Sequence, residues 1–292
     1  MVTKKQHYYP RCLLKHFASG DKKVFVYIRK GNKEALMNYE KLCASNYTYE
    51  SDNQIDNVLE RKLGMYESKI EPIIDNIIKN YKINNFSVSE KDQQELFQYL
   101  WLQYLRTDAG RINFVNLFEN IFSYNPRKGP LDLEEIEKKE NKDKIKRFNL
   151  VFKQGNRLEK LIESFRKTDI MNFHIARSMG NLLTSDNPVI GTDNWAQIML
   201  PIAPRICIVF QHDIINSSNS LQVMLTPDKT RYLNEATINT GNYYIISNED
   251  FSDKQREYIE NRFNNKNWIC SYPHADNLNV LNTKNQVIQL GF

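Results

Sequence analysis

The sequence predicts an α+β protein, in which a mostly helical N-terminal half packs on a C-terminal, mainly antiparallel sheet. Between about residues 55 and 168, apolar side chains recur at spacings of three and four, the pattern of helices with one buried face. From about residue 171, short β-rich segments are separated by Asn, Ser, Asp, Gly and Pro. The chain has 292 residues, of which 41% are hydrophobic, so it can bury a core of its own. We therefore expect a single α+β domain over residues 1–292.

Four helices are expected before the strand-rich part, over residues 55–81, from Ser87 or Ser89 to about Arg106, over 110–123 and over 156–168. In the first of these, Pro72 should kink or break the helix, because proline has no N–H to donate and its ring crowds the preceding turn. Ser87 and Ser89 each have an acidic residue three positions later, which is typical of a helix N-cap. The second helix is apolar over more than one face, so it should lie deep in the protein.

Residues 126–149 differ in character from the helices around them. Proline and glycine open the segment, and a dense run of mixed charges follows between residues 134 and 146. This composition predicts an exposed charged helix or an inserted segment. Strands are expected over residues 24–29, 172–178, 181–184, 197–201, 205–211, 220–226 and 242–247.

Three features limit the possible functions: the charge balance, the cysteine spacing and the absence of several known motifs. The 40 basic and 35 acidic side chains give a net charge of +5, which permits a nucleic-acid or other phosphate-bearing partner without requiring one. The four cysteines lack the spacing of a zinc or redox site. The chain has no apolar signal segment and no run of 18 apolar residues, so we expect a cytoplasmic protein without membrane contact. It also lacks the motifs of P-loop, dinucleotide-binding, zincin and α/β-hydrolase sites.

The N-terminal stretch from Gln6 to Phe17 is dense in reactive side chains. Pro10 can start a short helix, which places His7 just before a helix N-terminus. His7 is therefore a candidate general base or metal ligand, and Arg11 a candidate clamp for a phosphate or carboxylate. The alternative is that His7 and Arg11 fasten the beginning of the chain to the rest of the protein through hydrogen bonds.

A second polar stretch, Thr184 to Pro188, follows an apolar pair and precedes another. Asp186 could bind a divalent cation or orient a histidine. The alternative is a turn in which Asp186 and Asn187 satisfy the backbone around them. Arg106 ends a largely apolar helix, where it could bind phosphate or only complement the helix C-terminus.

These stretches resemble the motifs of the bacterial DUF4238 family. Gln6 to Arg11 resembles the opening of that family, Leu105-Arg106-Thr107 its helix-ending LRT, and Thr184 to Val189 its TSDNPV. Asn234, ahead of 243–247, is similar to a late asparagine that precedes the closing strand of the family. The resemblance implies no reaction, but it adds substrate-binding candidates to Arg11 and Arg106, namely Gln6, Ser185, Asn187 and Asn234.

The chain departs from the family pattern at two places. The family usually has a proline after the threonine of its LRT motif, where this chain has Asp108. Its closing strand usually carries Ala-Arg, where this chain has Tyr243-Tyr244. An anionic contact made by that arginine is therefore not expected here.

From these residues we expect an enzyme acting on a phosphate-bearing substrate, nuclease-like, with Mg²⁺ or Mn²⁺ as its metal if it uses one. His7 would be base or ligand, Asp186 would hold the metal or orient His7, and Arg11 and Arg106 would hold phosphate. The main alternative is a binding module without catalysis, and a third is a toxin-like effector that acts on another protein. The enzyme requires a solvent-reachable cleft that contains both His7 and Asp186, whereas the binding module allows both to be buried.

Overall fold

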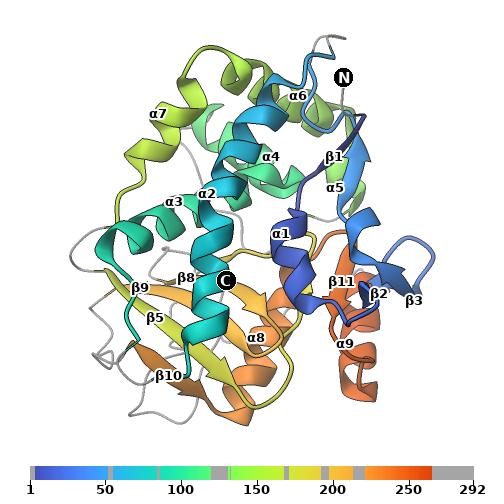
Figure 1. The fold of residues 1–292 in the computed structure, drawn as a ribbon. Helices are drawn as coiled ribbons and strands as arrows, with labels where there is room; N and C mark the ends of the chain where they lie inside the picture. Colours follow the sequence, from blue (N-terminus) through green and yellow to red (C-terminus); the bar gives the residue numbers. More distant parts are fainter. Residues whose placement is uncertain are drawn as a thin grey trace.

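The computed structural model confirms the α+β class, with most helices in the first half of the chain and most strands in the second (Figure 1). It describes residues 4–51, 55–83, 86–119, 131, 133–167, 171–191, 197–212 and 221–264. The helices of the first half beyond residue 50 are α2 (Val58–Asn80), α3 (Glu90–Arg106), α4 (Asp108–Glu119), α5 (Leu133–Glu137), α6 (Lys139–Lys153) and α7 (Arg157–Ser164).

A five-stranded sheet forms the centre of the second half, in the order β10-β5-β9-β8-β7. Its strands are β5 (Met171–Ser178), β7 (Ile190–Gly191), β8 (Gln197–Ala203), β9 (Ile206–His212) and β10 (Gln222–Leu225). The pairs within β5-β9-β8-β7 are antiparallel, while β10 runs parallel to β5. The expected, mainly antiparallel sheet is thus confirmed, with one parallel pair at its edge.

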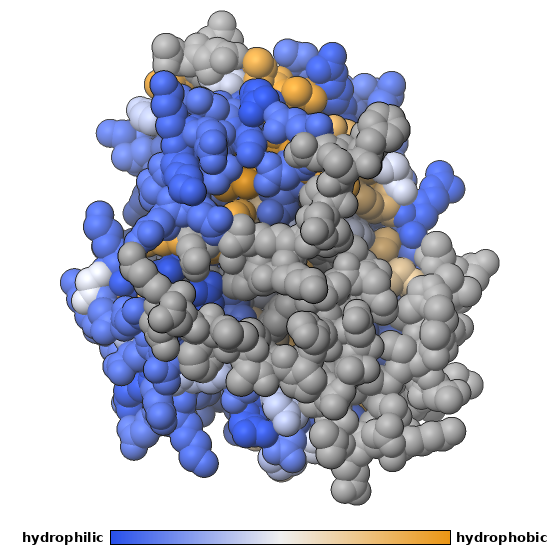
Figure 2. All heavy atoms as spheres, turned by 180° about the vertical axis from the view of Figure 1, so that it is seen from behind, coloured by the Kyte–Doolittle hydropathy of each residue, from blue (hydrophilic) through white to orange (hydrophobic). Residues whose placement is uncertain are grey.

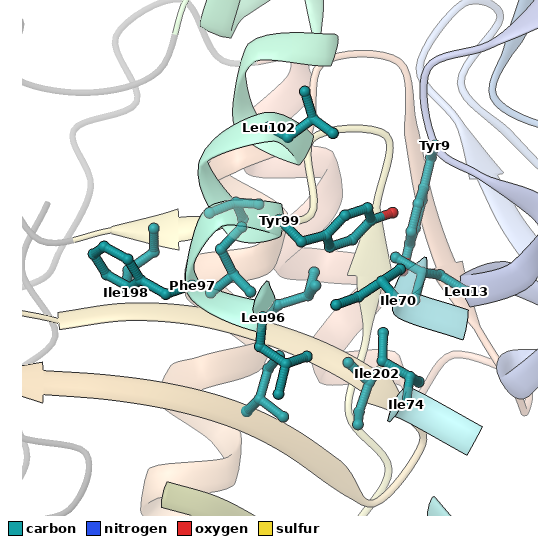
Figure 3. Close-up of a cluster of buried hydrophobic side chains, with 14 of the residues drawn as sticks. Tyr9, Leu13, Ile70, Ile74, Leu96, Phe97, Tyr99, Leu102, Ile198 and Ile202 are labelled. Carbon is teal, nitrogen blue, oxygen red and sulfur yellow. The ribbon is translucent and has the colours of Figure 1, made fainter. Parts of the chain in front are cut away.

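Both faces of this sheet are buried, and alternate side chains point to different cores. Ile208 and Phe210 face the larger core with α3, where the rings of Phe97 and Phe210 lie 5.2 Å apart. Cys207 and Val209 face the opposite core, which contains residues of α8 (Pro227–Thr240). Figure 3 shows how α3 lays Leu96 and Phe97 over β8 while Tyr99 points toward Ile70 and Tyr9. A sheet covered on both faces explains why its strands are almost continuously apolar.

A second sheet joins the two ends of the chain, in the order β3-β2-β11-β6. Its strands are β2 (Lys23–Ile28), β3 (Lys33–Asn38), β6 (Thr184–Ser185) and β11 (Tyr244–Ser247). Ile28 of β2 lies opposite Tyr244 of β11, and Ile245 of β11 lies opposite Ser185 of β6. Helix α9 (Asp253–Asn264) covers this sheet through a small core with Tyr27. Strand β11 therefore lies between the N-terminal hairpin and β6, which leads into the bend around residue 186.

The expected helices are found, with corrections in detail. Helix α2 continues unbroken through Pro72, because the buried Ile70, Ile74 and Ile77 anchor the helix on both sides of the proline. Ser89, not Ser87, caps α3, and its side chain accepts a hydrogen bond from the backbone N–H of Asp92. Helix α4 covers 108–119, and residues 120–123 of the expected helix lie outside the described part.

The charged segment expected over 126–149 forms helices α5 and α6 from residue 133 onward; residues 126–130 and 132 lie outside the described part. Its charged side chains mostly face solvent, but α6 is not a projecting insertion. Ile145 and Phe148 are buried, and the ring of Phe148 lies 5.5 Å from that of Phe114 in α4. Asn149 is also buried and donates to the carbonyl of Thr48 at 3.0 Å. The helix therefore packs by one face, and its other face carries the charges.

The surface seen from behind is mostly hydrophilic where it is described, with hydrophobic residues showing between the polar ones in its upper part (Figure 2). No helix within the described ranges is both long and apolar enough to cross a bilayer.

Candidate functional site

Strand β1 (Lys5–His7) carries the N-terminal motif and pairs antiparallel with β4 (Ala44–Asn46). Gln6 is fully buried, donates to the carboxylate of Glu50 at 2.7 Å and accepts from the backbone N–H of Tyr49 at 2.8 Å. Pro10 precedes the short helix α1 (Arg11–Leu14), as expected. Gln6 is thus committed to holding β1 in place and is not exposed to a substrate.

The His7 ring lies against the chain that follows β3. Its Nε2 is 3.2 Å from the carbonyl oxygen of Glu40 and 3.2 Å from Nε of Arg11, which also donates to that carbonyl. Burial lowers the pKa of His7, and the positive charge of Arg11 lowers it further, while the hydrogen bond to Glu40 raises it. The imidazole ring of His7 links β1 to the chain around Glu40. This agrees with the alternative in which His7 and Arg11 hold the beginning of the chain to the rest of the protein through hydrogen bonds.

Arg106, at the end of α3, is 1% exposed, and each of its three nitrogens lies close to a partner within the protein. Its Nη1 pairs with Glu67 at 2.6 Å, its Nη2 donates to the carbonyl of His7 at 2.6 Å, and its Nε donates to the hydroxyl of Tyr49 at 3.2 Å. The nearby negative groups keep the pKa of Arg106 above its ordinary value despite burial. Arg106 therefore pins β1 to the helices and leaves no donor facing outward for a phosphate.

A second buried arginine, Arg111 in α4, was missed in the sequence because it is not part of any motif. It donates to the carbonyl of Thr48 at 2.9 Å, to the side chain of Asn149 at 3.0 Å and to the carboxylate of Asp108 at 2.6 Å. The guanidinium lies 5.3 Å from the ring centre of Tyr49. In the sequence, Arg111 is an arginine close to apolar residues, and this alone does not indicate a buried role. The role becomes clear only from its hydrogen-bond partners in the structure.

Asp186 is 2% exposed, and its carboxylate accepts hydrogen bonds from a turn of the backbone. One oxygen accepts from the N–H groups of Asn242, Tyr243 and Tyr244 at 3.0, 2.8 and 2.9 Å. Burial raises the pKa of Asp186 to about 6, and these hydrogen bonds oppose the rise. The residue thus acts as the alternative interpretation expects, by satisfying the backbone, although the backbone is that of the distant residues 242–244.

The other residues of this motif are also committed internally. Ser185 and Asn187 form a tight turn, in which the Ser185 hydroxyl donates to the Asn187 carbonyl at 2.9 Å. The Asn187 side chain donates to the carbonyl of Thr240 at 3.2 Å. Asn234 accepts from the N–H of Leu183 at 2.8 Å and donates to the carbonyl of Asn181 at 2.8 Å. None of these three side chains is directed toward a solvent-reachable site.

The beginning of the chain does meet the bend at 186, but through its tyrosines. The Thr184 hydroxyl donates to that of Tyr9 at 3.0 Å, and the rings of Tyr8 and Tyr243 lie 6.5 Å apart. No hydrogen bond or ion pair between described residues joins His7 to Asp186. Within the described ranges, no three His, Cys, Asp or Glu side chains are grouped so that they could hold a metal ion. The two residues expected to form the catalytic centre are therefore hydrogen-bonded to other groups and not to each other.

A pocket of about 360 Å³ lies beside this meeting point, and we refer to it as the tyrosine pocket. It falls within the size range of small-molecule sites. Five separate parts of the chain line it: Tyr8, then 45–48 and Glu50, then Asp108, then Glu137, Lys142, Ile145, Lys146 and Asn149, and finally Tyr243 and Tyr244. None of the eight site residues expected from the sequence lines it, although Tyr8 immediately follows Gln6 and His7.

The carboxylates of the tyrosine pocket already have donors within the protein. Asp108 accepts from Arg111 at 2.6 Å and from the hydroxyl of Tyr243 at 3.0 Å. Glu137 pairs with Lys142 at 3.0 Å. Lys146, by contrast, takes part in none of the ion pairs found among the described residues, and it is exposed at the edge of the pocket. The pocket thus has a cation that is not neutralised by a carboxylate of the described chain.

The two places where the chain departs from the family pattern contact each other here, because Tyr243 donates to Asp108. The signal for the site was therefore present in the sequence, in Tyr8, Asp108 and the pair Tyr243-Tyr244. Each stands in or directly beside a motif. Nothing in their spacing indicated that they line one pocket.

Comparison with known proteins identifies the family of the chain but no function. Neither the proteins of curated function nor the solved structures contain a match to the chain. The family model described as "Protein of unknown function (DUF4238)" matches residues 5–251, from the start of β1 to a residue just before α9. The match includes every element that lines the tyrosine pocket, and it confirms the resemblance seen in the motifs: the chain belongs to the DUF4238 family.

Proposed function

We propose that the protein is a binding module without catalysis, and that it takes a phosphate-bearing small molecule in the tyrosine pocket. The observation that carries this proposal is the position of Lys146, an exposed lysine without an ion-pair partner among the described residues, at the edge of a pocket of about 360 Å³. Lys142, one helical turn earlier on α6, faces the same pocket. A lysine ammonium is a common point contact for phosphate.

Binding is favoured over hydrolysis by the state of the acidic side chains. A hydrolytic site of the expected kind needs a carboxylate free to hold a metal ion or to accept a proton. Each oxygen of Asp108 accepts one hydrogen bond, from Arg111 or from Tyr243, and the Arg111 cation beside this carboxylate opposes the binding of a metal cation. Glu137 is paired with Lys142. Glu50 accepts from Gln6 and from two backbone N–H groups, those of Asp56 and Asn57. The placement of His7 and Asp186 gives the nuclease-like mechanism no support either.

The proposal is tested by calorimetry with inorganic phosphate, ribose 5-phosphate and the four common ribonucleoside 5′-monophosphates. We expect at least one of these probes to bind, and Lys146→Ala to weaken that binding roughly 10-fold, as the loss of a charged hydrogen bond does. Rising salt should reduce the difference between wild type and variant, because screening weakens an exposed charge contact.

Lys139→Ala is the matched control, because Lys139 is an exposed lysine on the same helix that does not line the pocket. It should bind the probes as the wild type does. If no phosphate-bearing probe binds at millimolar concentration, or if Lys146→Ala binds as tightly as Lys139→Ala, the proposal fails. In parallel, DNA and RNA are incubated with the protein and Mg²⁺ or Mn²⁺. Cleavage by the wild type that is lost in His7→Ala would favour the nuclease-like enzyme over the binding module.

A further inference from the structure

The tyrosine pocket is lined by two chemically different sets of side chains. Lys142 and Lys146 extend from the same face of α6, four residues apart, and because Lys142 is paired with Glu137, Lys146 is the lysine of this pair without an ion-pair partner among the described residues. The lining also contains Asp108, which is bonded to Tyr243 and Arg111, and the tyrosine rings. A molecule that suits both sets has an anionic group and a ring that carries hydrogen-bond donors.

The tyrosines form a connected aromatic wall. The ring centres of Tyr8 and Tyr243 lie 6.5 Å apart, and those of Tyr243 and Tyr244 lie 6.4 Å apart. Tyr47, which is 38% exposed, adds a fourth ring to the lining. A wall of this kind offers ring faces to a planar ligand, and stacking on it does not depend on which base or ring is presented.

Asp108 can still accept hydrogen bonds from a ligand. One of its oxygens receives the Arg111 guanidinium and the other receives the Tyr243 hydroxyl. A carboxylate has about four acceptor positions, so roughly two are left for donors from a bound molecule. The amino groups and ring N–H groups of a nucleobase, or the hydroxyls of a ribose, are donors of the right kind.

We infer that the ligand of the tyrosine pocket is a nucleoside monophosphate unit, with its phosphate at Lys146 and its base against the tyrosine wall beside Asp108. This inference rests on the proposed function and specifies its ligand. The pocket volume of about 360 Å³ suits a single nucleotide and not a long polymer. The unit can be a free nucleotide or the 5′ end of an RNA chain, because both present the same phosphate, ribose and base.

The decisive experiment compares ligands on the unaltered full chain. Affinities are measured for ribose 5-phosphate, for the four ribonucleoside 5′-monophosphates, for the corresponding nucleosides and for a 5′-phosphorylated hexanucleotide. The best monophosphate should bind at least 10-fold more tightly than ribose 5-phosphate, because only it can stack, and at least 10-fold more tightly than its nucleoside, because only it reaches the lysines. The hexanucleotide distinguishes the two sources: tighter binding than the monophosphate identifies an RNA end, and weaker binding a free nucleotide.

A pair of double variants tests the aromatic wall. Tyr47→Leu with Tyr244→Leu removes two rings while keeping apolar side chains, and Tyr47→Phe with Tyr244→Phe keeps both rings. The leucine pair should lose roughly 10-fold in affinity for the monophosphate and little for ribose 5-phosphate, whereas the phenylalanine pair should retain the preference. Thermal unfolding of both pairs shows whether the fold is kept, and the ligand comparison on wild type does not depend on the variants.

The outcomes separate this inference from the proposed function. Equal binding of ribose 5-phosphate and the best monophosphate would overturn the nucleotide inference and leave phosphate binding intact. Equal binding of a nucleoside and its monophosphate would overturn the role of the lysines, and with it the proposed function. No binding of any probe would overturn both.

Discussion

Single side chains in this protein fasten distant parts of the backbone together. Asp186 bonds with one oxygen to three consecutive N–H groups of 242–244, and Arg106 joins α2, α3, β1 and Tyr49. The sequence offered both residues as candidates for ligand binding or catalysis, with a structural role as the alternative. Their hydrogen bonds agree with the structural role, because a fold rarely buries a charge without a partner for it.

Replacing Asp186 should test this structural role. Asp186→Ala leaves three buried N–H groups without an acceptor, so we expect a loss of more than about 3 kcal/mol in the free energy of unfolding. Asp186→Asn keeps an acceptor oxygen and should lose about half as much or less. Urea unfolding at pH 7 measures both variants. An Asp186→Ala protein as stable as the wild type would show that the carboxylate does not hold the turn.

Glu60 gives the protein a pH-dependent stability. It lies beside β1, and burial raises its pKa from 4.5 to about 7, although Arg106 and the backbone N–H of His7 favour the charged form. The stability contributed by this group is therefore fully present below about pH 4.5 and is lost as the pH rises through about 7. Glu60→Gln has no proton to lose. Its stability relative to wild type should rise by about 1–2 kcal/mol between pH 5.5 and pH 8, a value reduced for partial solvent exposure.

The measurement is urea unfolding of both proteins at the two pH values. Glu163→Gln, at an exposed position of α7, is the matched control and should show no such change with pH. A constant difference between Glu60→Gln and wild type would mean that Glu60 titrates at the same pH in the folded and unfolded chain.

Among the helices and strands, short stretches of sequence predicted where helices form better than they predicted which strands pair with each other. Helical periodicity, the cap of α3 and the proline before α1 could be read from short stretches. Helix α8 was missed, because its polar Thr230, Asn234, Thr237 and Asn239 are buried between sheet and loops and leave no apolar stripe in the sequence. In α4 the apolar residue type is also a poor guide to burial: Phe118 is 58% exposed, while Ala109 and Ile112 lie on the buried face of the helix.

The cap of α3 provides a clean test, because the sequence allowed two serines. Only Ser89 accepts a hydrogen bond from the helix, from the N–H of Asp92 at 3.1 Å. Ser89→Ala should lower the free energy of unfolding by about 1 kcal/mol, and Ser87→Ala, two residues away, should leave it nearly unchanged. Thermal or urea unfolding of both variants decides the point. Equal losses of stability in the two variants would show that Ser89 is not the one serine that caps α3.

At the scale of the whole molecule, the candidate site could not be predicted at all. Tyr8, Asp108, Lys146 and Tyr243 come from four segments far apart in the chain and meet only because two sheets and the helices between them bring them together. The sequence contained all four residues, and two of them departed from the family pattern. Periodicity and motifs describe short stretches of the chain, so they do not show which distant segments come together in the fold.

The second sheet should make the two halves of the chain depend on each other. β2 of the first half, whose other edge pairs with β3, pairs with β11 of the second half, and Tyr9 bonds to Thr184. We expect one cooperative unfolding transition, seen equally by circular dichroism and by tryptophan fluorescence. We also expect fragments divided after Ser164 to fold only when produced together. Two separate transitions, or a fragment folded alone, would show two independent units.

The pairing of β2 with β11 also determines when the site can exist during synthesis. Ile28 leaves the ribosome long before its partner Tyr244, so the first hairpin has to wait with an unpaired edge while most of the protein is made. Pairings so distant along the chain close slowly. The tyrosine pocket therefore lacks Tyr243 and Tyr244 until that part of the chain has been made, and a ligand that needs these two residues meets only a chain synthesised at least that far.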